Sequence, residues 1–200
     1  MAAVTHDDAV TLIQSAGIVR RAELETLGVS RSVLYRLVEE GEVERVARGL
    51  YVAAGHEPSA EHALALVAKR VPAGVVCLLT ALRFHDLTTQ APAEVWLAIP
   101  EKARAPRLEY PRLRIARFSG TALTEGIETH QIEGVNVRVY SAAKTVADCF
   151  KYRHKVGIDV AAEALRDFGA RYRGRATELA FFARICRVTR VMQPYLDAIA

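Results

Sequence analysis

The stretch GIVRRAELETLGVSRSVLYRLVEEGEVERVARGLYV, residues 17–52, decides the fold of the N-terminal part of the chain. It predicts a short helix that ends at Gly28 and a second helix that begins after Ser30, whose hydroxyl suits an N-cap. The residues expected to face inward are Ala22, Leu24, Leu27, Val33, Leu34, Leu37 and Val38. Because glycine permits a tight turn and Val29 can fill the angle between the helices, this spacing indicates a helix-turn-helix.

The flanking residues extend this motif into a winged helix. Thr5 and Asp8 have the spacing of a capping box, and the apolar residues that follow predict a first amphipathic helix ending at Gly17. The downstream run EVERVARGLYVA contains two β-prone segments around residues 47–49, which predict a hairpin. Three helices followed by a hairpin predict a winged helix-turn-helix domain over residues 1–57.

Residues 58–200 predict a second, mixed α/β domain after a linker at AAGHEPS, so the expected fold class is α+β. Helices are expected at 59–70, 79–87, 141–155, 158–169, about 176–187 and about 189–199. Strands are expected at 94–99, 112–118, 128–132 and 135–140, the last two joined around Glu133 and Gly134.

The composition indicates a globular protein of the cytoplasm. Hydrophobic residues make up 51% of the 200 residues, enough for one or two domains with their own cores. No apolar run approaches the roughly 20 residues that a membrane helix needs. The start, MAAVTHDDAVTLIQ, has neither the basic nor the apolar region of a signal peptide. We therefore expect a cytoplasmic protein with no membrane partner.

The three cysteines and six histidines indicate neither disulfides nor a metal site. Cys77, Cys149 and Cys186 are far apart and flanked by apolar residues, which is typical of buried thiols. No two histidines have the i, i+4 spacing that places both imidazoles on one helical face. We therefore expect no metal and no other cofactor.

The charge is divided unevenly along the chain. Residues 1–57 carry six Arg against nine Asp or Glu, a formal charge of −3, while residues 58–200 carry 21 Lys or Arg against 14 Asp or Glu, or +7. Most of the basic excess thus lies outside the helix-turn-helix. An argument for DNA binding must therefore depend on individual arginines rather than on net charge.

The second helix of the motif presents polar side chains outside its inward stripe. Arginine can bond guanine bidentately, serine can bond a phosphate or a base edge, and a helix N-terminus favours phosphate. Hairpin arginines are expected near the adjacent backbone or minor groove. The candidate DNA-binding residues are Arg31, Ser32, Tyr35, Arg36, Arg45 and Arg48. The alternatives are that these arginines are only solvated, or that the winged helix contacts protein.

A second polar constellation lies in AAKTVADCFKYRHK, residues 142–155. Its members are Lys144, Asp148, Lys151, Tyr152, Arg153 and Lys155. The four-residue spacing predicts a ridge on one helix, which either a structural salt-bridged face or a functional surface would explain. Further cations gather at 102–117 and 171–175, where a solvated loop, a DNA contact or an acidic partner would each explain them.

Three strings resemble the AbiEi antitoxins of AbiE-type (type IV) toxin–antitoxin systems. One is the stretch 17–52, with its succession of G, RAEL, G, S, L, RL and RGLY. The others are LTALRFHDLTTQAPAEVWLAIP, residues 79–100, and VRVYSAAKTVADCFKYRHKVGIDVAAEALRD, residues 137–167, which are more distinctive. The resemblance covers most of residues 10–170.

The resemblance implies a repressor that binds inverted repeats in the double-stranded DNA of its own operon, which favours a dimer on DNA. It also implies a partner toxin with a nucleotidyltransferase fold, which the C-terminal region counteracts with or without direct contact. The toxin's Gly-Ser followed by paired aspartates is absent, so the chain resembles the antitoxin. The constellation in residues 142–155 is then the candidate toxin-neutralising surface.

Two other functions stay open beside this one. A one-component transcriptional regulator would bind a small ligand in its second domain. A metal-dependent nuclease would need carboxylates within its strands, and the segments VWLAI and RLRIARF have none. The motifs of P-loop, dinucleotide-binding, serine-hydrolase and zinc-peptidase sites are also absent, so we expect no enzyme.

Overall fold

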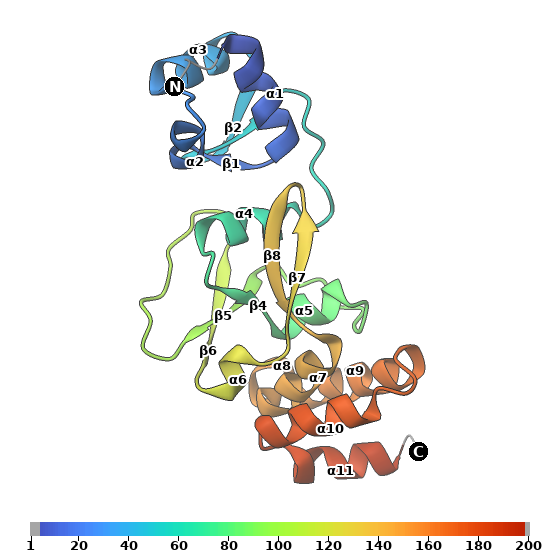
Figure 1. Cartoon of the computed structure of the whole chain (residues 1–200). Helices are drawn as coiled ribbons and strands as arrows, with labels where there is room; N and C mark the ends of the chain where they lie inside the picture. Colours follow the sequence, from blue (N-terminus) through green and yellow to red (C-terminus); the bar gives the residue numbers. More distant parts are fainter. Residues whose placement is uncertain (1–4, 199–200) are drawn as a thin grey trace. The chain divides into compact units, whose positions relative to one another are not determined.

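The computed structural model describes residues 5–198, and the chain forms two compact units. The first comprises the chain up to Pro72 together with His130–Val137, and the second comprises Ala73–Thr129 and the chain from Arg138 onward. Helices with a small antiparallel sheet, followed by a mixed sheet with further helices, confirm the α+β class (Figure 1).

This division does not coincide with the predicted boundary after residue 57. The helix at 62–70 and the tip of the hairpin at 130–137 belong to the first unit. Independent folding of residues 1–57 and of residues 58–200 therefore stays a prediction.

The first unit contains a winged helix-turn-helix followed by one further helix. Its elements are α1 (His6–Ala16), β1 (Val19–Arg20), α2 (Arg21–Thr26), α3 (Arg31–Glu39), β2 (Val43–Ala47), β3 (Leu50–Ala53) and α4 (His62–Arg70). The three strands form an antiparallel sheet in the order β1-β3-β2. Strands β2 and β3 are the predicted hairpin, while β1 is an additional strand that pairs Val19 with Tyr51.

Side-chain caps and one glycine set the ends of these helices. Thr5 and Asp8 form the predicted capping box at the start of α1. The Ser30 hydroxyl accepts a hydrogen bond from the backbone N–H of Val33 at 3.3 Å and so begins α3. Gly41, with φ of +76°, follows α3 in the left-handed conformation that glycine adopts without strain.

The core of the winged helix confirms most of the predicted inward residues. Leu24, Leu34 and Leu37 are at most 1% exposed, and Val29 is buried as predicted. Two predictions are wrong, because Ala22 is exposed and Leu27 is 48% exposed. Helix α2 ends at Thr26, so the residue that follows it leaves the helical stripe.

The second unit contributes most of a five-stranded mixed sheet and its covering helices. The remaining strands are β4 (Val75–Val76), β5 (Val95–Pro100), β6 (Leu113–Phe118), β7 (Ile127–Ile132) and β8 (Val135–Tyr140). The remaining helices are α5 (Leu78–Phe84), α6 (Thr121–Thr124), α7 (Ala142–Lys151), α8 (Arg153–Val156), α9 (Ile158–Arg171), α10 (Ala176–Ile185) and α11 (Thr189–Asp197). The strand order is β6-β5-β4-β8-β7.

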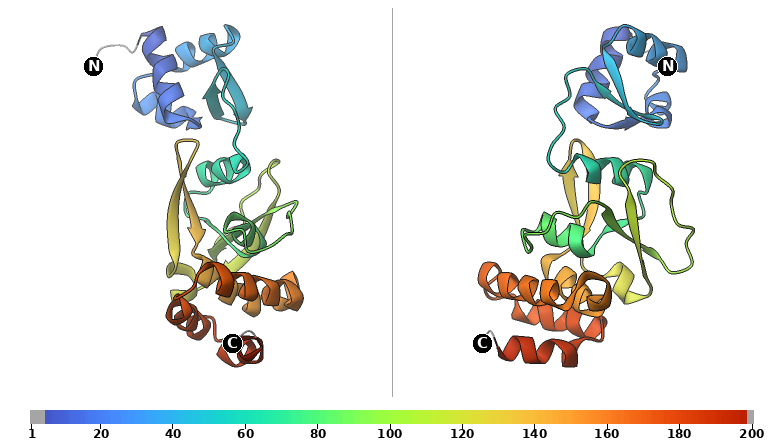
Figure 2. Two further views of the ribbon diagram at one scale, coloured as in Figure 1. Left: turned by 90° about the vertical axis from the view of Figure 1, so that its right-hand side faces the viewer. Right: turned by 180° about the vertical axis from the view of Figure 1, so that it is seen from behind.

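Within this sheet, β5 runs parallel to β6, and the short strand β4 runs antiparallel to β5 and parallel to β8. Helices α7, α9, α10 and α11 lie together in both views of Figure 2. Nine of the ten residues of α7 are buried, from Ala142 to Phe150, so this helix is the centre of the second core. Among residues 5–198, no helix is both long and apolar enough to span a membrane.

Three predicted helices differ from the observed ones, one of them because α5 ends at Phe84 and not at residue 87. The single helix expected at 141–155 is divided, since α7 ends at Lys151 and α8 begins at Arg153. The helix expected from residue 59 begins only at His62, and Ser59 hydrogen-bonds Glu133 instead. The last residue of the helix expected at about 189–199 lies outside the described residues.

Candidate nucleic-acid interface

Helix α3 separates an apolar face from a polar one. Leu34 and Leu37 anchor it in the core of the winged helix. The four candidate residues of this helix are all exposed, namely Arg31, Ser32, Tyr35 and Arg36. The 3.6-residue period places them on the side away from the core, so the predicted outer face is present in the structure.

The first turn of α3 is organised by local hydrogen bonds. The Ser30 and Ser32 hydroxyls lie 2.9 Å apart, and the Arg31 guanidinium donates to the Tyr35 hydroxyl at 3.2 Å. The Arg31 guanidinium carbon also lies 5.2 Å from the centre of the Tyr35 ring. The hydrogen bond from Arg31 lowers the pKa of the Tyr35 hydroxyl below its usual value. Arg31 and Tyr35 therefore present one joined polar surface.

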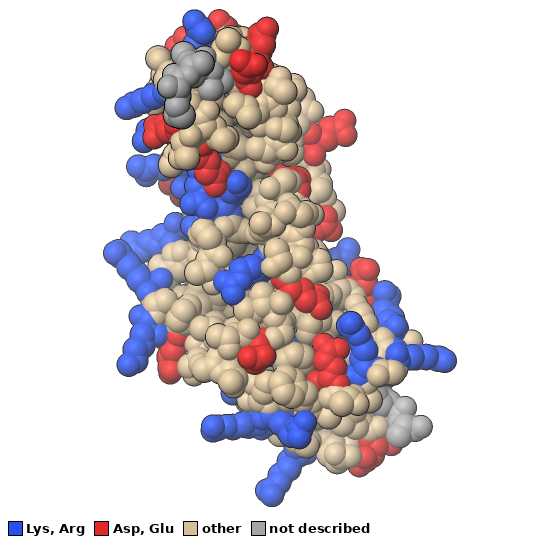
Figure 3. Space-filling view, viewed as in Figure 1, with Lys and Arg blue, Asp and Glu red and all other residues tan. Residues whose placement is uncertain are grey.

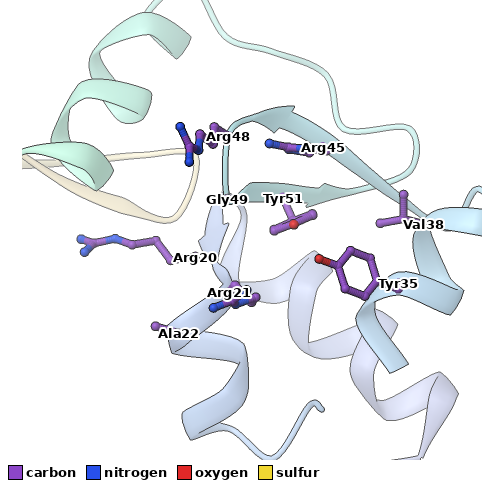
Figure 4. A pocket seen from close by; sticks show the side chains of 9 residues that line it. All are labelled: Arg20, Arg21, Ala22, Tyr35, Val38, Arg45, Arg48, Gly49 and Tyr51. Atoms are coloured by element: carbon purple, nitrogen blue, oxygen red, sulfur yellow. The ribbon is translucent and has the colours of Figure 1, made fainter. Parts of the chain in front are cut away.

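A groove of about 490 Å³ opens between α3, the start of α2 and the hairpin. Figure 4 shows Tyr35 of α3 and Arg21 of α2 beside the same space, with Arg45 on the hairpin side. The lining residues are Arg20, Arg21, Ala22, Tyr35, Val38, Arg45, Arg48, Gly49 and Tyr51. Three predicted DNA-binding residues, Tyr35, Arg45 and Arg48, thus line the groove. Arg20 and Arg21 also line it and were not predicted from the sequence.

The arginines of this region differ in how they are neutralised. Arg20 and Arg21 pair with Glu23 and Glu25, at 3.7 Å and 3.1 Å. Within residues 5–198, no carboxylate pairs with the other four, which are Arg31, Arg36, Arg45 and Arg48. These four guanidinium groups keep their charge uncompensated by a partner, which suits them to bind phosphate or a guanine edge.

Helix α4 supports the groove from within the same unit. The ammonium of Lys69 lies 2.8 Å from the Glu23 carboxylate, and the Arg70 guanidinium donates to the backbone carbonyl of Arg48. Burial disfavours the charged Glu23, but hydrogen bonds from Lys69 and the backbone of Arg20 outweigh it and lower the pKa of Glu23. Both contacts connect α4 to the elements that carry the groove arginines.

Net charge alone does not define this interface. Basic and acidic side chains are interspersed on the face shown in Figure 3, so neither sign covers it. Exposed carboxylates also lie at the end of α3 and just after it, at Glu39, Glu40, Glu42 and Glu44. The feature that suits nucleic-acid binding is therefore the outer face of α3 with its groove, and not a continuous basic surface.

The structure corrects the second predicted surface. Lys144 and Asp148 are both 0% exposed, so neither belongs to a surface. Their side chains form an ion pair one turn apart on α7, and the Cys186 thiol donates to the second Asp148 oxygen at 3.1 Å. Burial raises the pKa of the Asp148 carboxyl, and the charge of Lys144 opposes this effect. The i, i+4 spacing predicts an exposed ridge, whereas α7 is buried from Ala142 to Phe150.

The other four predicted residues of this surface remain accessible to different degrees. Lys151 and Lys155 are exposed, while Tyr152 and Arg153 are half-buried. The Tyr152 hydroxyl donates to the carbonyl of Arg117 at 2.6 Å, and burial raises its pKa to about 12. These residues lie around the break between α7 and α8 rather than along one ridge.

The basic run at 102–117 has both structural and exposed members. Arg117 donates to the carbonyls of Pro100, Glu101 and Ala103, and Arg114 lies 4.3 Å from the centre of the Trp96 ring. Lys102, Arg104, Arg107 and Arg112 are exposed, as Arg114 and Arg117 also are. Part of this run therefore stabilises the sheet and its following loop, and part faces solvent.

The fold and the outer face of α3 define a winged helix-turn-helix domain. Residues 7–54 match the family model described as "Transcriptional regulator, AbiEi antitoxin". This segment is therefore similar to the regulator domain of AbiEi antitoxins, which confirms the resemblance for the N-terminal part of the chain. No curated protein matches the chain. The resemblance of residues 79–100 and 137–167 lies outside the matched segment and stays a prediction.

Proposed function

We propose that this chain is a cytoplasmic DNA-binding antitoxin that represses its own toxin–antitoxin operon. One observation carries the proposal. A domain similar to AbiEi regulators presents arginines with no carboxylate partner among the described residues, namely Arg31, Arg36, Arg45 and Arg48. In helix-turn-helix proteins the second helix enters the major groove with its N-terminal residues at the base edges. Helix α3 is then the recognition helix, whose side chains contact the bases.

The division of roles among the six residues follows from their positions. Arg31, Ser32 and Tyr35 lie in the first turns of α3 and would approach base edges. Arg36, Arg45 and Arg48 would bind phosphates and fix the position of the domain on the duplex. Arg20 and Arg21 line the same groove and would add phosphate contacts once DNA competes for their carboxylate partners.

The second part of the proposal concerns a toxin with a nucleotidyltransferase fold. The strings at 79–100 and 137–167 support it, because they resemble the C-terminal region of AbiEi antitoxins. The candidate neutralising surface is reduced to its accessible members, Lys151, Tyr152, Arg153 and Lys155. We propose no catalytic role for these residues.

One winged helix makes few base contacts, so useful specificity requires two copies on an inverted repeat. Half-sites should then lie about 34–36 Å apart, or a multiple of that distance. Footprinting of the full-length protein on the promoter of its own operon tests this. Paired protections separated by whole helical turns are expected. A single unpaired footprint, with one protein bound at saturation, would contradict the proposed mode of repression.

A second candidate function is a one-component regulator that binds a small ligand. One observation favours it, a groove of about 400 Å³ between α9, α10 and α11 in the second unit. Its lining is mainly apolar, with Leu165, Phe168 and Leu179 beside the polar Gln193 and Asp197. The two polar side chains hydrogen-bond each other at 2.7 Å, which leaves less capacity for a ligand. A toxin gene beside this one would count against this candidate.

A further inference from the structure

Three potential metal ligands meet in the first unit, outside the helix-turn-helix. His56 lies in the segment between β3 and α4, His62 is the first residue of α4, and Glu133 lies in the turn between β7 and β8. One ligand atom from each lies within 4.8 Å of the others. The His56 Nε2 and the His62 Nδ1 both face the same carboxylate oxygen, Glu133 Oε2, at 2.8 Å and 2.7 Å.

The carboxylate is held in place from its other side. Glu133 Oε1 accepts two hydrogen bonds from Ser59, one from its backbone N–H and one from its hydroxyl, both at 2.7 Å. Oxygen Oε2 is therefore left to the two imidazoles. In metal sites, residues that do not touch the metal orient the carboxylate ligands through hydrogen bonds of this kind.

The turn that carries Glu133 is also fixed. Glu133 and Gly134 have φ of +49° and +74°, as the central residues of a type I′ hairpin turn require. The turn lies against the end of α1, where the Ile18 N–H donates to the Glu133 carbonyl at 3.3 Å. A Cβ on Gly17 would lie 2.0 Å from that carbonyl oxygen, so only glycine fits there. The backbone thus presents this carboxylate in one position.

We propose that His56, His62 and Glu133 bind one divalent first-row transition-metal ion, with Zn²⁺ as its probe. Imidazole nitrogen with a carboxylate oxygen suits zinc and its neighbours, whereas Ca²⁺ and Mg²⁺ prefer oxygen ligands alone. Three protein ligands leave one position of a tetrahedral site for water. The bound ion would fasten the segment after β3 to the hairpin turn.

The distances between the three ligand atoms need to lengthen only slightly to hold a zinc ion. Zinc bonds to nitrogen and oxygen are about 2.0–2.2 Å, which places tetrahedral ligand atoms about 3.3 Å apart. The two nitrogens would each move about half an ångström from Glu133 Oε2, and each imidazole would bind the ion through its unprotonated nitrogen and carry its proton on the other ring nitrogen. The Glu133 side chain is 6% exposed and the two histidines 18% and 19%, so an ion can enter from the histidine side.

The full-length protein, freed of metal with a chelator, is titrated with ZnCl₂ by calorimetry and by equilibrium dialysis. One Zn²⁺ per chain is expected, together with a rise in Tm. His62→Ala and Glu133→Gln should each weaken zinc binding at least tenfold. Ser59→Ala should weaken it about 10–100-fold, because the variant loses a hydrogen bond that orients the metal-binding carboxylate. His6→Ala is the matched control, because His6 faces two carboxylates, Asp7 at 3.4 Å and Glu40 at 2.6 Å, without a second imidazole.

X-ray absorption spectroscopy of the zinc-loaded wild-type protein identifies the ligand atoms directly. This measurement does not depend on whether a variant folds. Two imidazole ligands with oxygen are expected. Sulfur ligation, or fewer than two imidazoles, would overturn the proposal. It would also be overturned if the wild type retained no zinc in dialysis, or if wild type, His62→Ala and Glu133→Gln bound zinc equally.

Discussion

Arg31 and Tyr35 are joined across one turn of α3 by a hydrogen bond of 3.2 Å and by a cation–π contact, with the guanidinium carbon 5.2 Å from the ring centre. These two contacts restrain a long cationic side chain on the outer face of α3. Since ordering a flexible arginine costs free energy on binding, this contact prepares the outer face of α3 for recognition. Arg36, on the same helix, has no carboxylate partner among the described residues.

Glu25→Gln is expected to tighten DNA binding. Glu25 lies 3.1 Å from Arg21, whose side chain lines the groove, so removal of its charge leaves Arg21 free to bind phosphate. The gain should be at most about 1 kcal/mol, the size of an exposed ion pair, and the salt slope should steepen by about 0.9. Titrations of promoter DNA at several salt concentrations measure both quantities.

Glu109→Gln provides the control for this variant, because it removes one exposed negative charge from the second unit. Equal tightening by the two variants would show a general effect of net charge and would remove Arg21 from the interface.

Lys144→Met is expected to destabilise the protein by about 3–5 kcal/mol, because it leaves the buried Asp148 carboxylate without its partner. The double variant Lys144→Met/Asp148→Leu should recover most of this loss, since no unpaired charge stays in the core. Urea unfolding measures both. A single variant as stable as the wild type would mean that the pair is solvated, contrary to its complete burial.

The double variant Lys151→Glu/Arg153→Glu is expected to lose toxin neutralisation while it keeps promoter repression. Both residues lie beside the α7–α8 break, away from α3 in the sequence and in the other compact unit. Growth during co-expression with the toxin of the neighbouring gene measures neutralisation, and a reporter measures repression. Arg184→Glu/Arg190→Glu makes the same charge change on exposed positions of α10 and α11. Normal rescue by the first double variant would refute the surface assignment.

Fragments 1–57 and 58–200 are expected to separate DNA binding from neutralisation, as two domains joined by a linker do. Fragment 1–57 should bind the operator more weakly than fragment 1–72, because it lacks Lys69 and Arg70, which contact Glu23 and the Arg48 carbonyl. Fragment 58–200 should still rescue growth. Rescue by fragment 1–57 alone, or failure by a folded fragment 58–200, would disprove this division.

The sequence was sufficient to predict the helix starts, the hairpin turn and the exposed face of α3, because interactions between residues close in the chain determine them. The capping box at Thr5 and the N-cap at Ser30 mark helix starts that are present in the structure. The turn at Glu133 and Gly134 was also predicted, since a polar residue before glycine favours a tight hairpin turn. The exposed positions of α3 follow from the same helical period that identified its buried leucines.

Tertiary packing determines what the sequence did not predict. Strand β1 is two residues long and exists only through its pairing with β3. Lys144 and Asp148 have the spacing of a surface ion pair, and only the surrounding helices make that pair internal. The histidine cluster includes Glu133, 71 residues away from His62, so a search for helical spacing could not find it.

Binding of Arg31→Ala and Arg36→Ala to promoter DNA, titrated at several salt concentrations, tests the reading role of α3 most directly. A lost bidentate guanine contact should cost about 1–3 kcal/mol and relax specificity at one base pair. A lost phosphate contact should weaken all sequences alike and reduce the salt slope by about one. Unchanged affinity and unchanged slope in both variants would contradict the assignment of α3 as the recognition helix.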